Sequence, residues 1–178
     1  MMKIEYNSIG FPKHLGKKFS GKSIMQITSS DLLLSAITVG RASYLDVFKF
    51  GKHSIYEIVY RCHIILANLR VTSNSIIKSP AFTNLDPSEK ASITFSLGLT
   101  LTNLFASKLL NVPWLLHLDV YSNYLASIGS KVNLINGNSR PDLIGLDNKG
   151  NWLIFESKGR SGKSDARTRA RAACQKTD

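Results

Sequence analysis

The sequence predicts a protein of mixed α and β structure, in the α/β or α+β class, with a helical N-terminal half packed on a small mixed β-sheet. Between residues 30 and 125, apolar residues recur with the helical period. After Gly129 the pattern changes to the alternation typical of strands. An apolar fraction of 43% in 178 residues is enough for an ordinary domain with a hydrophobic core. These patterns divide the chain into residues 1–28, 29–125 and 126–178.

The N-terminal fifty residues combine a basic segment with a first helix. Residues 1–28 are polar, rich in lysine and contain glycine, so we expect an irregular basic arm there. Ser29-Ser30-Asp31 has the composition of a helix cap, and it predicts a helix from Leu32 towards Phe50. Gly40 lies inside this range and leaves the continuity of the helix open.

Two sequences in the helical region fit a capping box, in which two side chains satisfy the free N–H groups of a helix start. They are Ser54 to Glu57 and Asp86 to Glu89. The second predicts a helix that runs to about Leu110 and ends before Pro113. Part of it, residues 91–107, carries no charge, but its serines, threonines and asparagine favour a buried core helix over a membrane span.

The third region contains the clearest hairpin signal, at Asp147-Asn-Lys-Gly150. A loop closed by a glycine in the left-handed region would pair Asp147 with Asn151 and fix every later pair. In this register Asp142 lies directly opposite Glu156, with their Cβ atoms about 4.5–5.5 Å apart. The apolar run Trp152 to Phe155 predicts a buried, central strand that ends at Glu156.

Carboxylates placed opposite each other repel, and they make sense around a cation that both ligate. Oxygen ligands of this type suit Mg²⁺, or Mn²⁺ in its place. Lys158 follows Glu156 by two residues and projects from the same face of a strand. Its ammonium could orient an attacking water or stabilise negative charge on a phosphate. The arrangement predicts metal-dependent hydrolysis of a phosphodiester bond.

Pro141-Asp142, followed after thirteen residues by Glu156-Ser157-Lys158, resembles the PD-(D/E)xK nuclease superfamily. The wider runs Arg140-Pro-Asp-Leu-Ile-Gly and Trp152 to Arg160 resemble uncharacterised bacterial members. The resemblance spans about residues 115–176. It implies a restriction-endonuclease-like core, whose element order is commonly αβββαβ. Residues 126–178 would form part of this nuclease core. It also implies that Asp142 and Glu156 bind the metal, that the Ser157 carbonyl is a further ligand, and that Lys158 is catalytic.

The positive net charge of the chain indicates a polyanionic partner. Lysine and arginine outnumber aspartate and glutamate by 23 to 12, which gives a formal net charge of +11. Chains this basic usually bind nucleic acid or an anionic membrane surface. We expect nucleic acid, in particular DNA, with no membrane partner and a cytoplasmic location, because the N-terminus carries no apolar signal segment. The residues expected to hold phosphates are Arg140, Arg160, Lys163, Arg167, Arg169 and Arg171.

The sequence is also compatible with other interpretations. Members of the superfamily often add an acidic residue from a helix, for which Glu57, Glu89 and Asp119 are candidates, although the first two are also explained as caps. The Asp142–Glu156–Lys158 set could belong to an ordinary salt-linked hairpin. The chain could bind nucleic acid without cleaving it, or act as a helical protein-interaction module through residues 91–110. The sequence leaves the oligomeric state undetermined.

Overall fold

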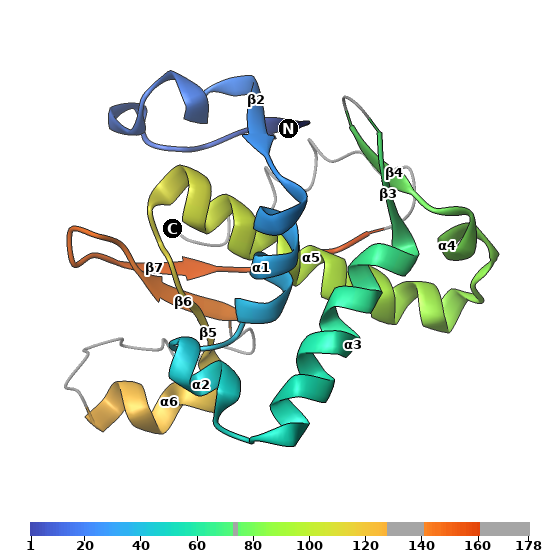
Figure 1. Cartoon of the computed structure of the whole chain (residues 1–178). Helices are drawn as coiled ribbons and strands as arrows, with labels where there is room; N and C mark the ends of the chain where they lie inside the picture. Colours follow the sequence, from blue (N-terminus) through green and yellow to red (C-terminus); the bar gives the residue numbers. More distant parts are fainter. Residues whose placement is uncertain (73–74, 128–140, 161–178) are drawn as a thin grey trace.

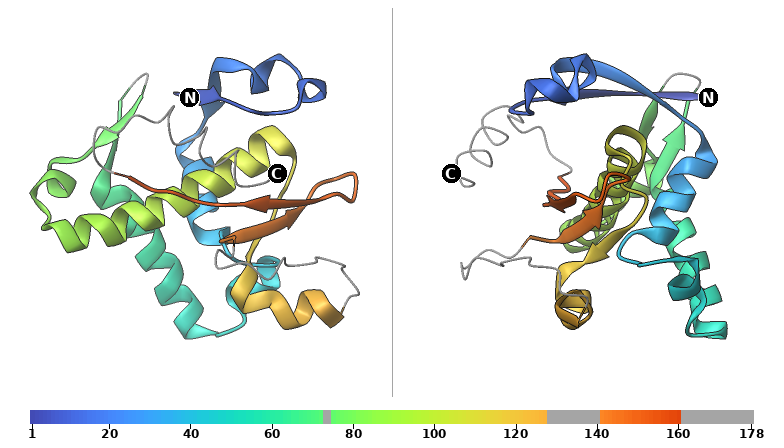
Figure 2. Two further views of the ribbon diagram at one scale, coloured as in Figure 1. Left: turned by 180° about the vertical axis from the view of Figure 1, so that it is seen from behind. Right: turned by 90° about the vertical axis from the view of Figure 1, so that its left-hand side faces the viewer.

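The structure, a computed structural model, describes residues 1–72, 75–127 and 141–160, and it is of mixed α and β class, as predicted. Helix α5 (Pro87–Leu110) crosses the middle of the molecule. A hairpin formed by residues 2–27, the N-terminal hairpin, lies on one side of it, helices α1 (Ser29–Thr38) and α3 (Lys52–Asn68) lie on a second, and a small sheet lies on a third (Figures 1 and 2).

The expectation of an irregular arm over residues 1–28 is wrong. Strands β1 (Met2–Ser8) and β2 (Gly21–Ile27) form an antiparallel hairpin, whose long connection contains the short 3-10 helices η1 (Lys13–Leu15) and η2 (Lys17–Phe19). The strands form because every second residue is apolar and faces inward, a pattern that is hard to see in the sequence because lysines lie between these residues. Met2, Met25 and Ile27 are buried on the inner face, while lysines alternate outward.

The helix expected from Leu32 towards Phe50 is interrupted. Helix α1 (Ser29–Thr38) ends before Gly40, whose φ of +76° no helix accommodates, and a short α2 (Tyr44–Phe48) follows. The cap of α1 lies one residue earlier than expected: the Thr28 hydroxyl accepts from the Asp31 N–H, and the Asp31 carboxylate accepts from the Thr28 N–H.

The capping box expected at Ser54 is also wrong. Helix α3 (Lys52–Asn68) begins two residues before Ser54, and the buried Ser54 hydroxyl accepts a hydrogen bond from the Phe50 N–H. Glu57 points away from the helix start and pairs with arginines instead. By contrast, the box at Asp86 and Glu89 is confirmed, and α5 ends at Leu110 as predicted.

Helix α5 is preceded by a small hairpin, β3 (Leu69–Val71) with β4 (Ile76–Lys78), and by the short helix α4 (Pro80–Asn84). Among the described helices, α5 is the one long and apolar enough to cross a membrane by length and composition. In this fold its Leu99, Leu104 and Ala106 are buried in two apolar clusters that join the sheet to the N-terminal half.

The sheet pairs β5 (Leu115–His117), β6 (Leu143–Leu146) and β7 (Trp152–Phe155) in that order, with helix α6 (Leu118–Ser127) between the first two along the chain. Both pairings are antiparallel, so the described sheet is not mixed as expected. Moreover β5 lies within residues 29–125, so the predicted boundary at 125 divides the sheet between two regions.

Strand β7 was expected to be central, but it is the edge strand of the described sheet. Its inner face, with Leu153 and Phe155, packs on the cluster that α5 shares with β5 and β6. On the outer face α6 covers Leu116 and Ile144, yet among the described residues this cover does not reach Ile154, which is 57% exposed. An apolar run on both faces therefore did not mean burial on both.

Candidate active site

The predicted hairpin register is confirmed. Leu143 pairs with Phe155 and Leu146 with Trp152, and the turn between them has Gly150 at φ +84°. The Asp147 carboxylate stabilises this turn by accepting from the Lys149 and Asn151 N–H groups, each at 2.8 Å.

Asp142 directly precedes Leu143 and Glu156 directly follows Phe155, so both lie just beyond the last pair of β6 and β7. The Asp142 carbonyl accepts from the Leu118 N–H at 3.2 Å, which ties this position to the β5 side of the sheet. The two acidic residues thus lie at the same end of a three-stranded sheet.

The Asp142 carboxylate is half-buried and fixed in place. Its Oδ2 accepts a hydrogen bond of 2.7 Å from the Ser157 N–H, so the carboxylate spans from β6 to the segment after β7. A hydrogen bond to a charged acceptor contributes about 1.5–3 kcal/mol. This bond orients the carboxylate and leaves Oδ1 as a second, separate acceptor on the same group.

The segment after β7 alternates between exposed and buried side chains. Glu156 and Lys158 are exposed, and the Lys158 ammonium forms an ion pair with the Glu156 carboxylate. Ser157 between them is buried at 7% exposure, facing α5. Lys158 and Glu156 are therefore adjacent, as a shared strand face predicts, although the structure pairs them directly with each other.

Two glycines allow this segment to lie directly on α5. A Cβ atom at Gly98 would be 2.8 Å from the Gly159 nitrogen and 2.9 Å from the Ser157 hydroxyl. A Cβ atom at Gly159 would overlap the Thr94 carbonyl, at 2.8 Å from its carbon and nearer still to its oxygen. Because both contacts involve backbone, larger residues there would push Glu156, Ser157 and Lys158 away from α5.

The same segment borders a cavity of about 770 Å³ that the sequence did not reveal. Its other walls come from α5 and the N-terminal hairpin, with Leu97, Leu101, Phe105, Phe11 and Phe19 among the lining residues. Lys158 and Arg160 lie at its border beside Ser157.

His117 lies beneath this end of the sheet, on the side of α1 and α3. A Cβ atom at Gly40 would overlap its ring, 3.2 Å from Cγ and nearer to two further ring atoms. Burial lowers the pKa of His117, and the positive charge of Arg61 acts in the same direction. The Asp142 carbonyl and carboxylate oppose this shift without reversing it, so the imidazole is neutral at pH 7.

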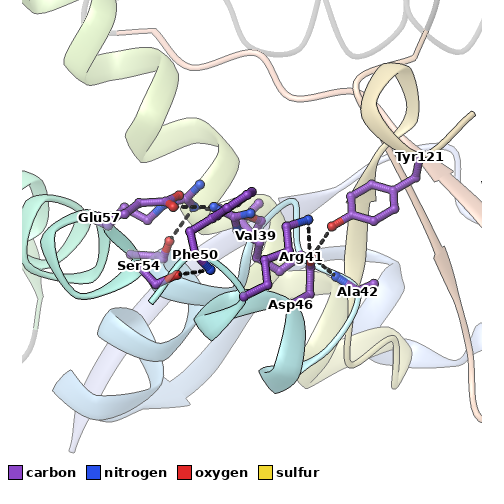
Figure 3. A network of polar contacts seen from close by, with 11 residues as sticks. Val39, Arg41, Ala42, Asp46, Phe50, Ser54, Glu57 and Tyr121 are labelled. Carbon is purple, nitrogen blue, oxygen red and sulfur yellow. Dashed lines mark hydrogen bonds and ion pairs between the residues drawn. The ribbon is translucent and has the colours of Figure 1, made fainter. Parts of the chain in front are cut away.

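Glu57 does not belong to the candidate site. It accepts from Arg41 and from Arg61, whose Nε lies 2.9 Å from Oε1, and the Arg61 guanidinium also donates to the Ala36 and Val39 carbonyls at the end of α1 (Figure 3). Burial raises the pKa of the Glu57 carboxyl, but the two arginines outweigh it and hold the pKa below its usual value.

The network in Figure 3 continues through Asp46, which accepts from Tyr121, from Lys49 and from the Ala42 N–H. Burial and the Asp46 carboxylate together raise the pKa of Tyr121 to about 12. These contacts tie α2 to α6 and explain Glu57 and Asp46 as structural charges. Of the remaining acidic candidates, Glu89 caps α5 and Asp119 lies exposed in the first turn of α6.

The residues at the end of the hairpin fit Mg²⁺ or Mn²⁺ by their chemistry. Within the described residues no group of three or more His, Cys, Asp or Glu side chains is placed to hold a metal ion. Mg²⁺ does not need one, because it is usually bound by one or two carboxylates together with waters and substrate phosphates. Asp142 and Glu156 supply two carboxylates, and the Ser157 carbonyl supplies a hard oxygen between Glu156 and Lys158.

Of the residues predicted to hold phosphates, Arg160 is exposed and borders the cavity close to Lys158. Arg140, Lys163, Arg167, Arg169 and Arg171 lie outside the described residues. The alternating pattern of residues 131–136 predicts a strand and the sequence after Ser164 predicts a helix, and both stretches lie outside the described residues as well.

Comparison with known proteins adds no relative to these observations. No family model, no curated protein and no solved structure matches this chain. The assignment of a function therefore depends on the geometry and chemistry of the chain itself.

Proposed function

We propose that this protein hydrolyses phosphodiester bonds of nucleic acid, in particular DNA, with the help of Mg²⁺ or Mn²⁺. The observation that carries the proposal is the hairpin register, which brings Asp142 and Glu156 to the same end of the sheet with Lys158 alongside. Two carboxylates and an ammonium at one strand end, the ammonium of Lys158 also bordering a cavity, are more than an isolated surface ion pair supplies.

The order of elements supports a restriction-endonuclease-like core. In the described residues a long helix, α5, is followed by three antiparallel strands that are neighbours in chain order, β5, β6 and β7. This corresponds to the start of the αβββαβ pattern, with α6 added between the first two strands. The acidic residues lie at the ends of the second and third strands.

Each residue of the proposed site has a distinct task. The Asp142 and Glu156 carboxylates and the Ser157 carbonyl would hold the ion, and the hydrogen bond from the Ser157 N–H would keep Asp142 in place. A bound ion supplies Lewis acidity and lowers the pKa of water. The Lys158 ammonium would orient the attacking water or stabilise the charge that develops on the phosphate.

Metal binding requires the Glu156 carboxylate to leave the Lys158 ammonium. Both side chains are exposed, at 39% and 62%, and ion pairs in such positions contribute only about 0–1 kcal/mol. The pair therefore opposes metal binding weakly. If Glu156 held an ion, the Lys158 ammonium would no longer pair with it and would be free to face the substrate.

The surroundings fit a polyanionic substrate. Arg160 follows Lys158 by two residues, and both border the cavity between α5 and the N-terminal hairpin. Exposed guanidinium and ammonium groups hold phosphates without reading the base sequence. We assign the same role to Arg140, Lys163, Arg167, Arg169 and Arg171, whose number contributes to the net charge of +11.

The test is a cleavage assay on plasmid and single-stranded DNA with Mg²⁺ or Mn²⁺. The wild type should cut at least one substrate, and EDTA should abolish cutting. Lys158→Ala and Asp142→Asn should each reduce the rate by about 10²-fold or more. Lys149→Ala is the matched control, because Lys149 is an exposed lysine at the hairpin tip, and its cutting rate should be unchanged.

A non-catalytic nucleic-acid-binding protein is the second candidate, and one observation favours it. Asp142 Oδ2 and Glu156 Oε1 both already accept hydrogen bonds from groups of the chain. On this alternative the charges only stabilise the hairpin. DNA would then be bound equally well by the wild type and Asp142→Ala, with or without Mg²⁺, and neither would cut it.

A further inference from the structure

Helix α3 carries an apolar face that the rest of the described fold does not cover. Its side chains are Ile55, Tyr56, Val59, Tyr60, His63 and Leu66, which we call the α3 outer face. Tyr56, Tyr60 and Leu66 are 66%, 62% and 60% exposed, while Ile64 and Ile65 on the opposite side are buried. The solvent side of a surface helix is normally polar, so this arrangement indicates a contact surface.

The spacing along this face is that of a helix that packs on another helix. Ile55, Val59, Cys62 and Leu66 are separated by four, three and four residues, the repeat of a coiled-coil seam. Cys62 is half-buried within this seam. In the views of Figures 1 and 2, α3 lies at the edge of the molecule, and Tyr60 on its outer face also borders a small pocket that includes His117.

The area is sufficient for a specific interface. An aromatic side chain offers about 150–250 Å², so the two tyrosines, each roughly two-thirds exposed, present about 100–160 Å² each. With the exposed parts of Ile55, Val59 and Leu66, the face presents roughly 500 Å² of apolar surface. A stable interface buries about 800 Å² per partner, of which about 60% is apolar.

The face is complementary to itself in an antiparallel arrangement. If two α3 helices cross with a two-fold axis between Tyr60 and Arg61, Ile55 of one copy meets Leu66 of the other and Val59 meets Cys62. Antiparallel alignment also places each helix N-terminus beside the C-terminus of its partner, which the helix dipoles favour.

Other classes of occupant fit this face less well. Nucleic acid and anionic lipid both need lysine or arginine within the contact surface, and the α3 outer face contains none. The charged residues inside the helix, Glu57 and Arg61, pair with each other on another side. Lys52 lies at the start of α3, and Arg70 lies beyond its end, in β3.

We propose that two copies of this chain associate through the α3 outer face, with the two α3 helices antiparallel. This inference is independent of the proposed nuclease activity, because none of its residues belongs to that site. Since burial of apolar surface drives the contact and each copy carries a net charge of +11, added salt screens the repulsion between copies and should strengthen association rather than weaken it.

Sedimentation velocity on the full chain at 1–100 µM, in about 0.1 M and 0.5 M NaCl, tests the association. The wild type should form a dimer, more strongly at the higher salt. Val59→Glu should weaken it by about 30-fold or more, because it places a carboxylate in the contact. Val120→Glu is the matched control: Val120 is 69% exposed on α6, and its variant should dimerise like the wild type.

Circular dichroism and thermal melting would show that both variants fold. A wild type that stays monomeric at 100 µM overturns the proposal, as does a folded Val59→Glu that dimerises normally or a Val120→Glu that dimerises as poorly. Dimers that salt dissociates would indicate a charged contact elsewhere and would also overturn it.

The orientation has its own test in a background with both cysteines replaced by serine. Chains with Ile55→Cys and chains with Leu66→Cys should cross-link to each other through a short bismaleimide. Neither should cross-link alone, because an antiparallel pair separates identical positions by eleven residues, about 16 Å along the helix. Cross-linking of Ile55→Cys to itself would indicate parallel helices and refute the arrangement.

Discussion

Replacement of Gly159 by alanine tests how the fold positions the candidate site. The new Cβ atom would lie 2.8 Å from the Thr94 carbonyl carbon and 3.3 Å from the Phe95 nitrogen, both in the backbone of α5. Ordinary carbon contacts are about 3.5 Å, and the overlap with the Thr94 oxygen is worse, so the segment and the helix must separate by roughly 1 Å. Neither side can yield by rotating a side chain.

The magnitude follows from two losses. Overpacking in a tight contact costs about 1–3 kcal/mol. Retreat of the segment also stretches the hydrogen bond from the Ser157 N–H to the Asp142 carboxylate, whose contribution is about 1.5–3 kcal/mol when intact. Because the two effects share one movement, we expect a total loss of about 3 kcal/mol in the free energy of unfolding.

Urea denaturation measures this loss, and the cleavage assay measures its consequence at the site. A displacement of about 1 Å among catalytic groups reduces the rate by about 10²-fold, so Gly159→Ala should cut DNA far more slowly than the wild type. Gly21→Ala is the control, since its φ of +77° is strained by alanine although no atom lies within 4 Å. It should lose about 1 kcal/mol and keep its cutting rate. A Gly159→Ala variant as stable as the wild type would refute the predicted contact with α5.

Three further predictions concern the charges and the packing around α1 and α3. Glu57→Gln should lower the free energy of unfolding by about 2 kcal/mol at pH 7, because it removes the charge that pairs with Arg41 and Arg61. The difference between variant and wild type should shrink as the pH falls below 4.5. The pKa of Glu57 is lowered in the folded chain, so its stabilising charge is lost when the folded carboxyl is protonated. The pKa of His117 is lower in the folded chain than in the unfolded chain, so on acidification the unfolded chain takes up a proton at a higher pH than the folded chain does. The free energy of unfolding of the wild type should therefore fall as the pH drops below 6.5, and that of His117→Gln should fall less. Gly40→Ala should cost about 3 kcal/mol in a thermal or urea melt, since it combines a φ of +76° with overlap of the His117 ring.

Each of these three has a result that would contradict it. If the difference in the free energy of unfolding between Glu57→Gln and the wild type stays constant from pH 7 to pH 3, the charge of Glu57 does not stabilise its contacts with Arg41 and Arg61. The change in stability of His117→Gln between pH 8 and pH 5.5 measures the contribution of the other groups. If the wild type shows the same change, His117 is not a buried neutral imidazole. An unaffected Gly40→Ala would mean that the turn after α1 differs from the structure.

Local signals of the sequence predicted local structure well. The capping box at Asp86 and Glu89 and the hairpin at Asp147 to Gly150 are both decided by hydrogen bonds between neighbouring residues, and both are present. The hairpin register followed from the turn by counting, which is why the pairing of Leu143 with Phe155, next to Asp142 and Glu156, could be predicted.

The errors arise where distant parts of the chain decide the structure. Ser54 and Glu57 have cap spacing, but Arg41 and Arg61 supply partners for Glu57 that no local pattern reveals. The lysines of residues 1–28 suggested an arm, whereas the alternate apolar residues find cover on α1 and α5. The contact of Gly98 with Gly159 joins residues far apart in sequence, so the position of the site relative to α5 was not predictable.

The central claim is that Asp142 and Glu156 together hold a divalent ion, and Mn²⁺ binding followed by electron paramagnetic resonance tests it without depending on turnover. The account predicts one Mn²⁺ per chain for the wild type and for Lys158→Ala, competition by Mg²⁺, and loss of binding in Asp142→Asn and in Glu156→Gln. Equal binding by the wild type and both carboxylate variants, or no binding by any of them, would contradict the account.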